Sequence, residues 1–229
     1  MLYKSKKSKE PRRNVRKLGK DLDFASIEAY NLLRTNLMFS LPDSVSGKAV
    51  GITSACPQDG KSTTSINLAY VLAEAGFKVL LVDADMRRPS LAKSLDVSMM
   101  PGLSNYLVEN CPDAIRTGIL HDNLSVLLSG DIPPNPSELI GSEKMKQFVV
   151  EAREKFDYIL FDLPPVNAVS DPLVMSKNLD GIILVVRHTH SKRREVSEAV
   201  RQFELVGAKI LGFVYNGVYK TRHSYHVSH

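Results

Sequence analysis

The stretch Ala55–Thr64, ACPQDGKSTT, constrains the fold more than any other part of the chain, because it contains the end of a phosphate-binding loop, Gly60–Thr63. The apolar segment 49–53 before it predicts a strand, and residues 61–75 after it have the apolar spacing of a helix. A strand before such a loop and a helix after it are the context in which the motif binds a nucleotide. The sequence therefore predicts a P-loop NTPase fold.

The loop suggests a role for each of its residues. Backbone N–H groups and the helix N-terminus attract phosphate oxygens, while Gly60 lets the backbone approach them closely. Lys61 would neutralise the β and γ phosphates, and the Ser62 hydroxyl would ligate Mg²⁺. Ala55 replaces the usual first glycine, where a small residue still fits the turn. The predicted nucleotide contacts are Pro57, Gln58, Asp59, Gly60, Lys61, Ser62 and Thr63.

Three further carboxylates follow apolar segments that read as strands. Asp162 ends the run YILFD and is the expected Walker B residue, although an aspartate there could instead serve a turn or a helix cap. Asp83 and Asp85 are two residues apart at the end of another strand, where ligands collect in open α/β sheets. They could bind Mg²⁺ or accept a proton, and Arg87 and Arg88 could balance their charge or pair with phosphate.

Strand and helix patterns alternate along the rest of the chain. Predicted strands cover 78–82, 124–128, 157–161, 181–186 and 210–215, and predicted helices cover 26–39, 103–109, 136–154, 171–177 and 191–206. Several strands are apolar throughout, which is typical of strands buried on both faces. The fold class expected is α/β, with a mostly parallel sheet flanked by helices on both faces. Asn135 and Glu138 predict a capping box at the start of the 136–154 helix.

Several ordered motifs resemble the bacterial tyrosine kinases, or BY-kinases, of capsule and exopolysaccharide synthesis. After the P-loop they are VDADMRRP, GDIPPNPSEL and FDLPPVNAVSD, with EAYNLLRTNLMFS before it. The resemblance runs from Ser26 to Lys220. It implies a P-loop fold related to partition and septum-positioning ATPases. It also implies an ATP-dependent, non-specific protein-tyrosine kinase that autophosphorylates its C-terminal tyrosines and regulates polysaccharide synthesis.

The resemblance also implies roles for individual residues. Lys61, Asp83 and Asp85 would be catalytic, and Asn216 would contact adenine, although it could simply end a strand. The metal ligands for Mg²⁺ would be Ser62, Asp85 and Asp162. We hypothesise that Asp83 accepts the tyrosine proton and Asp85 holds Mg²⁺, but spacing alone does not rank the two carboxylates.

Acceptors and an assembly surface follow from the same resemblance. Tyr219 and Tyr225 are the expected phosphoacceptors, a smaller set than many family members carry. The family forms a ring through a Glu-x-x-Arg-x-x-Arg helix, and here Glu28, Asn31 and Arg34 occupy those positions. Three-residue spacing keeps them on one helix face, but Asn31 removes one ion pair. We expect a homo-oligomer, possibly as a ring.

Charge is distributed unevenly along the chain. The net charge is +5, but Met1–Lys20 alone carries nine Lys and Arg residues and one Glu. This segment could be a solvated tail, bind anionic lipid or bind nucleic acid; we expect no nucleic acid partner. The expected organisation is a basic, disordered tail over 1–22, a P-loop kinase domain over 23–218 and a flexible tyrosine-bearing tail over 219–229.

The sequence also suggests a location and partners. It shows no apolar run of membrane-spanning length and no signal-peptide pattern, and its two cysteines form no disulfide framework. We expect a cytoplasmic protein recruited to the inner face of the cell membrane. The resemblance implies a transmembrane adaptor of the polysaccharide co-polymerase type, protein tyrosine substrates and a cognate tyrosine phosphatase.

A different function class stays open. A partition or septum-positioning ATPase would hydrolyse ATP as a switch and transfer no phosphate to tyrosine. Those ATPases carry a lysine five residues before the main lysine of the loop, and Cys56 stands there in this chain. The tail tyrosines and Arg87-Arg88 also favour the kinase.

Overall fold

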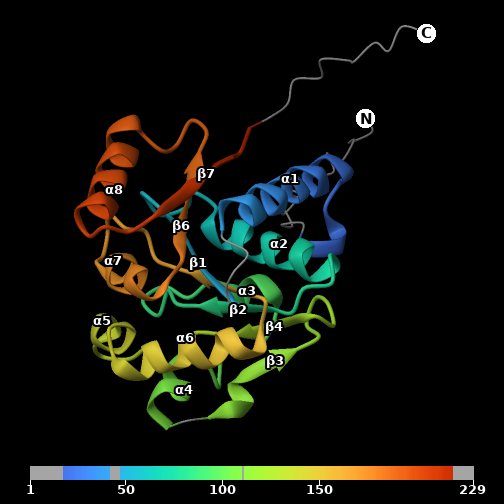
Figure 1. The fold of residues 1–229 in the computed structure, drawn as a ribbon, viewed down its shortest axis with the longest axis vertical. Coiled ribbons are helices and arrows are strands. Elements are labelled where there is room, and N and C mark those ends of the chain that lie inside the picture. Colours follow the sequence, from blue (N-terminus) through green and yellow to red (C-terminus); the bar gives the residue numbers. More distant parts are fainter. Residues whose placement is uncertain (1–17, 42–46, 110, 219–229) are drawn as a thin grey trace, which may run out of the picture.

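The computed structural model describes residues 18–41, 47–109 and 111–218, which build a seven-stranded sheet between two layers of helices (Figure 1). The strand order is β3-β4-β2-β5-β1-β6-β7, and every neighbouring pair is parallel except β3 with β4. The strands are β1 Lys48–Ser54, β2 Val79–Asp83, β3 Ile115–Thr117, β4 Leu124–Leu127, β5 Tyr158–Asp162, β6 Gly181–Arg187 and β7 Ile210–Asn216. The predicted α/β fold class is confirmed.

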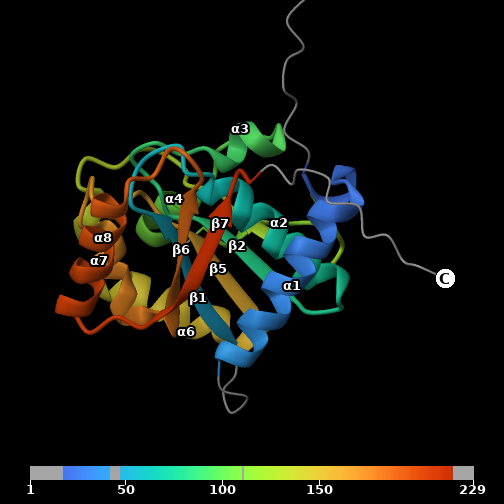
Figure 2. The same ribbon diagram turned by 90° about the horizontal axis from the view of Figure 1, so that it is seen from above.

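Helices cover both faces of this sheet. One face carries α1 Phe24–Ser40, α2 Lys61–Glu74 and α3 Leu91–Leu95. The opposite face carries α4 Leu103–Glu109, α5 Pro136–Ile140, α6 Glu143–Lys155, α7 Asp171–Met175 and α8 Arg193–Leu205. Figure 2 shows α1 and α2 on one side of the strands and α7 and α8 on the other.

The central strands are apolar because each one supplies two hydrophobic cores. Along β2, Leu80 and Val82 join the core under α4–α8, whereas Val79 and Leu81 join the core under α1–α3. All four side chains are fully buried. This alternation follows from the two-residue period of a strand and explains the continuous apolar runs in the sequence.

The parallel strands place the chemistry-bearing loops at one edge. The carboxyl ends of β1, β2, β5, β6 and β7 lie together, as their register requires. The segments that follow these strands contain the phosphate-binding loop, the Asp83–Arg88 segment and the Pro164-Pro165 segment. Ligands of open α/β sheets bind at such an edge.

The structure corrects some predicted elements. The single helix expected over 136–154 is two helices, because Ser142 starts a new one by accepting a hydrogen bond from the Met145 N–H at 3.2 Å. The capping box expected at Asn135 is wrong: its side chain makes no cap bond and instead donates to Glu138 Oε2 at 3.2 Å. The short elements α3 and β3 were not predicted.

The start of the described chain packs against α2. A 3-10 turn spans Gly19–Asp21, and the buried Gly19 N–H donates to Asn67 Oδ1 at 3.0 Å. The described chain therefore already contacts the domain before residue 23. The predictions for Met1–Lys17, Tyr219 and Tyr225 lie outside the described residues. Among the described helices, none has the length and apolarity needed to cross a membrane.

Candidate active site

A cavity of about 860 Å³ opens at the carboxyl edge of the sheet, in the upper part of the range typical of ligand sites. Most of the residues predicted to contact the nucleotide line it. They are Pro57, Gln58, Gly60, Lys61, Ser62, Thr63 and Asn216. Asp85, Arg87 and Arg88 line it as well. Asp59 is different, because its side chain is fully buried and does not border the cavity.

Gly60 makes the turn that starts α2. Its φ of 95° is in the left-handed region, where residues with a Cβ are strained. A Cβ there would also lie 2.0 Å from Nδ2 of Asn216, so only glycine fits. Ala55, which replaces the usual first glycine, is buried in the core and has an ordinary negative φ, so this position does not need glycine.

Lys61 is the first residue of α2, and its ammonium group is surrounded by carboxylates. Its Nζ lies 3.0 Å from Asp85 Oδ2 and 3.8 Å from Asp162 Oδ1. Burial disfavours the charged ammonium, but the charges of Asp162 and Asp85 outweigh it and raise the pKa of Lys61 above its ordinary value. Lys61 is therefore a fixed positive charge at the position where phosphate oxygens would lie.

Asp83 and Asp162 are the most deeply buried carboxylates of this group. They are paired residues in the register of β2 and β5, and neither is exposed. Burial first, and then repulsion by Asp162, raise the pKa of Asp83 to about 8. Asp83 accepts hydrogen bonds from the backbone N–H of Leu91 at 3.1 Å and of Asp85 at 3.3 Å. Asp83 thus lies behind Asp85, which borders the cavity.

The donor set fits a magnesium ion. Asp162 Oδ1 accepts a bond from Ser65 at 3.2 Å, whereas its buried Oδ2 has no hydrogen-bond partner among the described residues. Ser62 Oγ borders the cavity and accepts a hydrogen bond from Ser90 at 2.8 Å. Carboxylate and hydroxyl oxygens are the ligands that Mg²⁺ prefers. An orphaned buried carboxylate oxygen is also a group that a cation would satisfy.

Arg87 does not face the Asp83–Asp85 pair as a counter-charge. Its Nε lies 2.9 Å from Oδ2 of Asp171, and its Nη2 lies 3.2 Å from Oδ1 of Asp171 and 2.8 Å from Oγ of Ser137. Asp171 is fully buried at the start of α7, and Ser137 lies in α5. Three of the sequence motifs therefore meet at this bidentate ion pair. The backbone N–H of Arg88 donates to Asp85 Oδ1 at 3.0 Å, whereas its guanidinium group has no ion pair or hydrogen bond in the part that the structure describes.

The remaining predicted residues lie apart from the cavity. Asn31 donates to Glu28 at 3.2 Å on the exposed side of α1. Arg34 instead donates to the carbonyl oxygen of Val71 in α2 at 2.9 Å, which joins the two helices. Sequence reasoning missed Arg187, His190 and Ser191, which contact the phosphate-binding loop. No local sequence pattern marks these three residues, because they are about 130 residues away from the phosphate-binding loop in the sequence.

Comparisons with known proteins agree with this geometry. The family described as "ParA: NUBPL iron-transfer P-loop NTPase" matches residues 47–228. Tyrosine-protein kinase YwqD of Bacillus subtilis is 38% identical over 200 residues, which are 86% of this chain and 83% of YwqD. The chain spans only 28% of the longer Escherichia coli tyrosine-protein kinase etk, at 36% identity.

Solved structures with a similar fold include a tyrosine kinase domain and a septum site-determining protein. The kinase domain of Escherichia coli tyrosine kinase ETK superposes with a TM-score of 0.80 at 34% identity, covering 86% of this chain and 78% of that one. The septum site-determining protein MinD of Pyrococcus horikoshii, complexed with Mg-ADP, has a TM-score of 0.61 at 25% identity. That match covers 74% of this chain and 70% of MinD.

Proposed function

The chain belongs to the bacterial tyrosine-protein kinases within the P-loop NTPases, and we propose that it transfers the γ-phosphate of ATP to tyrosine hydroxyls of proteins. The observation that carries the proposal is the cluster of Lys61, Asp85 and Asp162 at the edge of the cavity. It combines a fixed cation for phosphate with carboxylates for a metal and for a proton. Similarity to YwqD over most of both chains directs this chemistry to tyrosine.

In the proposed reaction the tyrosine oxygen bonds to the γ-phosphorus, the bond to the β,γ-bridging oxygen breaks, and ADP leaves. Lys61 would hold the transferring phosphate by charge, because a cation in a buried site is weakly screened. Ser62 and Asp162 would hold Mg²⁺, with Asp85 beside them. When bound, Mg²⁺ would offset the phosphate charge that develops during transfer.

The tyrosine proton passes to the carboxylate pair Asp83 and Asp85 in this scheme. Asp85 borders the cavity and can reach the reactants. Asp83 is suited to act as a base, because burial and repulsion by Asp162 raise its pKa to about 8, near the pH at which a general base is most effective. The scheme therefore assigns the proton to this pair, with Asp85 at the cavity and Asp83 behind it.

Assembly and acceptors form the second part of the proposal. Tyr219 and Tyr225 follow β7 directly in the sequence, and β7 ends beside the cavity at Asn216. We propose that a neighbouring copy phosphorylates them within a homo-oligomer that uses the α1 face of Glu28 and Asn31. Arg34 is committed to Val71, so we assign it to holding α1 in place.

Membrane recruitment and regulation complete the proposal. The kinase would act with a transmembrane adaptor at the inner face of the membrane, a tyrosine phosphatase would reverse its action, and polysaccharide synthesis would be the process controlled. The basic segment Met1–Lys20 would add attraction to anionic lipid. Deleting it should weaken binding to anionic vesicles most at low salt; equal binding by both forms would remove the lipid role.

The experiment that tests the activity is direct. Purified protein is incubated with Mg-ATP and a peptide from the cytoplasmic part of the adaptor, and phosphotyrosine is mapped by mass spectrometry. Phosphotyrosine on the chain or on an added substrate supports the kinase. ATP hydrolysis without any phosphotyrosine would favour the partition-type switch, the fold of which MinD shares. Iron transfer is not proposed, because the chain has only two cysteines, Cys56 and Cys111, far apart in the sequence.

A further inference from the structure

The buried carboxylate of Asp59 joins the phosphate-binding loop to a distant segment, the β6–α8 loop, residues 188–192. Its Oδ1 lies 2.8 Å from Nδ1 of His190 and accepts a hydrogen bond from Ser191 Oγ at 2.8 Å. Its Oδ2 accepts a hydrogen bond from the N–H of Cys56 at 3.2 Å. Because Asp59 is fully buried, each of these contacts offsets part of the cost of removing a charge from water.

Two carbonyl groups of the same turn are held from the same side. Arg187 Nη1 donates to the carbonyl oxygen of Gln58 at 2.8 Å, and Asn216 Nδ2 donates to the carbonyl oxygen of Asp59 at 2.9 Å. Arg187 ends β6 and Asn216 ends β7. Four side chains from the C-terminal part of the sequence therefore contact a single turn of the phosphate-binding loop: Arg187, His190, Ser191 and Asn216.

These contacts determine which way the loop presents its N–H groups. A peptide unit is planar and trans, so its carbonyl oxygen and the next N–H point in opposite directions. Carbonyl oxygens of Gln58 and Asp59 that point to β6 and β7 direct the N–H groups of Asp59 and Gly60 to the other side. Gln58 has a φ of 67°, which a residue with a Cβ adopts only when surrounding contacts hold it.

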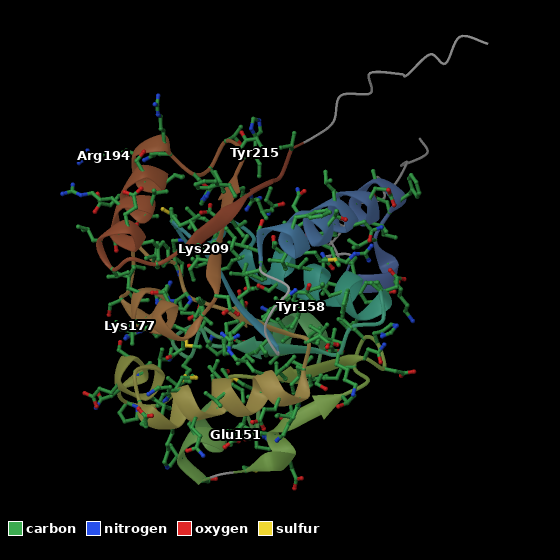
Figure 3. The ribbon with its side chains drawn as sticks, in the orientation of Figure 1. Glu151, Tyr158, Lys177, Arg194, Lys209 and Tyr215 are labelled. Carbon is green, nitrogen blue, oxygen red and sulfur yellow. The ribbon has the colours of Figure 1, made fainter. Side chains whose placement is uncertain are left out.

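Asn216 could act on the nucleotide in two ways, by contacting adenine directly or by holding the phosphate-binding loop. Its amide nitrogen is engaged by the loop, and it also limits residue 60 to glycine. A side chain that holds the loop in this way acts on the nucleotide through the backbone. Figure 3 shows Tyr215, the residue before Asn216, at the end of β7, and His188 of the β6–α8 loop contacts its hydroxyl group.

We propose that His190 and Ser191, acting through Asp59, are positioning residues that set nucleotide affinity by holding the phosphate-binding loop in its binding conformation. Arg187 and Asn216 support the same turn. The inference rests on the proposed function only in taking the ligand to be an adenine nucleotide. It places control of nucleotide affinity in a loop that follows β6, away from the phosphate-binding motif in the sequence.

The test measures binding of Mg-ADP to the full chain by calorimetry. His190→Ala combined with Ser191→Ala removes both side-chain donors from Asp59 Oδ1 and should weaken Mg-ADP binding about tenfold. Turnover at saturating ATP should stay within about threefold, because no group that touches the reactants is changed. The matched control is His188→Ala with Ser197→Ala, which makes the same two substitutions nearby at residues that do not contact Asp59 and should bind as the wild type does.

A third variant separates positioning from a general loss of structure. In the wild-type background Asp59→Asn should weaken binding, because its amide nitrogen would face the Cys56 N–H. In the His190→Ala/Ser191→Ala background it should restore part of the affinity, because a neutral amide is buried more easily than a carboxylate that has lost its side-chain donors. Ser191→Ala alone, the mildest change, should give a smaller loss of affinity.

Three outcomes would overturn the inference. Unchanged Mg-ADP affinity in the double variant would show that the contact does not position the loop. Additive effects of the double variant and Asp59→Asn would show that His190 and Ser191 do not act through Asp59. A wild-type protein that binds no adenine nucleotide would overturn this inference and the proposed function together, whereas the first two results leave the proposed function intact.

Discussion

Asp83 and Asp162 are paired residues in the parallel register of β2 and β5, so two buried carboxylates share one site beside Lys61. A single lysine cannot fully neutralise them together with Asp85. Burial raises the pKa of both carboxyl groups, and repulsion adds to it, by Asp162 at Asp83 and by Asp85 at Asp162. The domain gives up stability at this point in order to concentrate the groups that a phosphoryl transfer needs.

The first prediction is that Asp83→Asn stabilises the protein in the absence of magnesium and nucleotide. The native pKa of Asp83 is about 8, above its ordinary value of 3.8, so the native state binds a proton that the unfolded state releases. Stability of the wild type should therefore fall as pH rises from about 4 to about 8, and Asp83→Asn should lack this part of the slope. At pH 8 the variant should melt at least about 3 °C higher. Scanning calorimetry in EDTA measures this; a variant that melts lower at pH 8 would contradict it.

The second prediction separates Asp85 from Asp83 by their need for metal. Asp85→Asn removes the ion pair with Lys61 and a carboxylate that borders the cavity, so its remaining activity should increase with Mg²⁺ concentration. Asp83→Asn removes a base behind the cavity, so added Mg²⁺ should not restore its activity. Initial rates across a Mg²⁺ titration distinguish the two. Rescue of Asp83→Asn and not of Asp85→Asn would reverse these roles, and full activity in both would make the pair structural.

The third prediction concerns the ion pair of Arg87 with Asp171. Arg87→Gln leaves the buried Asp171 without a charged partner among the described residues and should lower the free energy of unfolding by about 2–3 kcal/mol. Arg87→Lys should recover little, because lysine cannot bind both carboxylate oxygens side by side. Arg88→Gln is the neighbouring control and should change stability by less than about 0.5 kcal/mol. Urea unfolding measures all three; equal effects at both arginines would refute the assignment.

The fourth prediction is that tail phosphorylation occurs between copies and weakens the oligomer. One chain carries Lys61→Met with an intact tail, and the other is active but carries Tyr219→Phe and Tyr225→Phe. Phosphate should appear on the inactive chain, and sedimentation should show smaller species afterwards, because each phosphate adds about −1.5 to −2 charges. Phosphate that never reaches the inactive chain would exclude transfer in trans. An unchanged sedimentation profile would exclude the effect on assembly.

Local sequence patterns predicted the fold class and the position of the site, for physical reasons. Lys61, Ser62 and Asp162 could be proposed as candidates because the first two start the helix after the phosphate-binding loop and the third ends an apolar strand. Strands such as β2 could be identified because burial on both faces leaves few polar residues. These features depend on neighbours within about ten residues, which a sequence displays directly.

The remaining features depend on contacts that a sequence does not display. Asp59 was expected to face the nucleotide, but its partners His190 and Ser191 lie more than 130 residues away and turn its side chain into the protein. Arg87 was expected near phosphate or the carboxylate pair, but Asp171 holds it. Short elements such as α3 and β3 have too few residues to show a period, and the break before α6 depends on one serine cap.

The central claim is that the γ-phosphate goes to tyrosine and that Lys61 is needed for the transfer. Its most direct test is to follow the label from [γ-³²P]ATP with wild-type protein, Lys61→Met protein, Mg²⁺ and a tyrosine-containing protein substrate, and to quantify label on tyrosine against label released as inorganic phosphate. We predict label on tyrosine with the wild type and a loss of at least about 100-fold with Lys61→Met, while circular dichroism shows the fold retained. Label found only in inorganic phosphate, or Lys61→Met protein as active as the wild type, would contradict the claim.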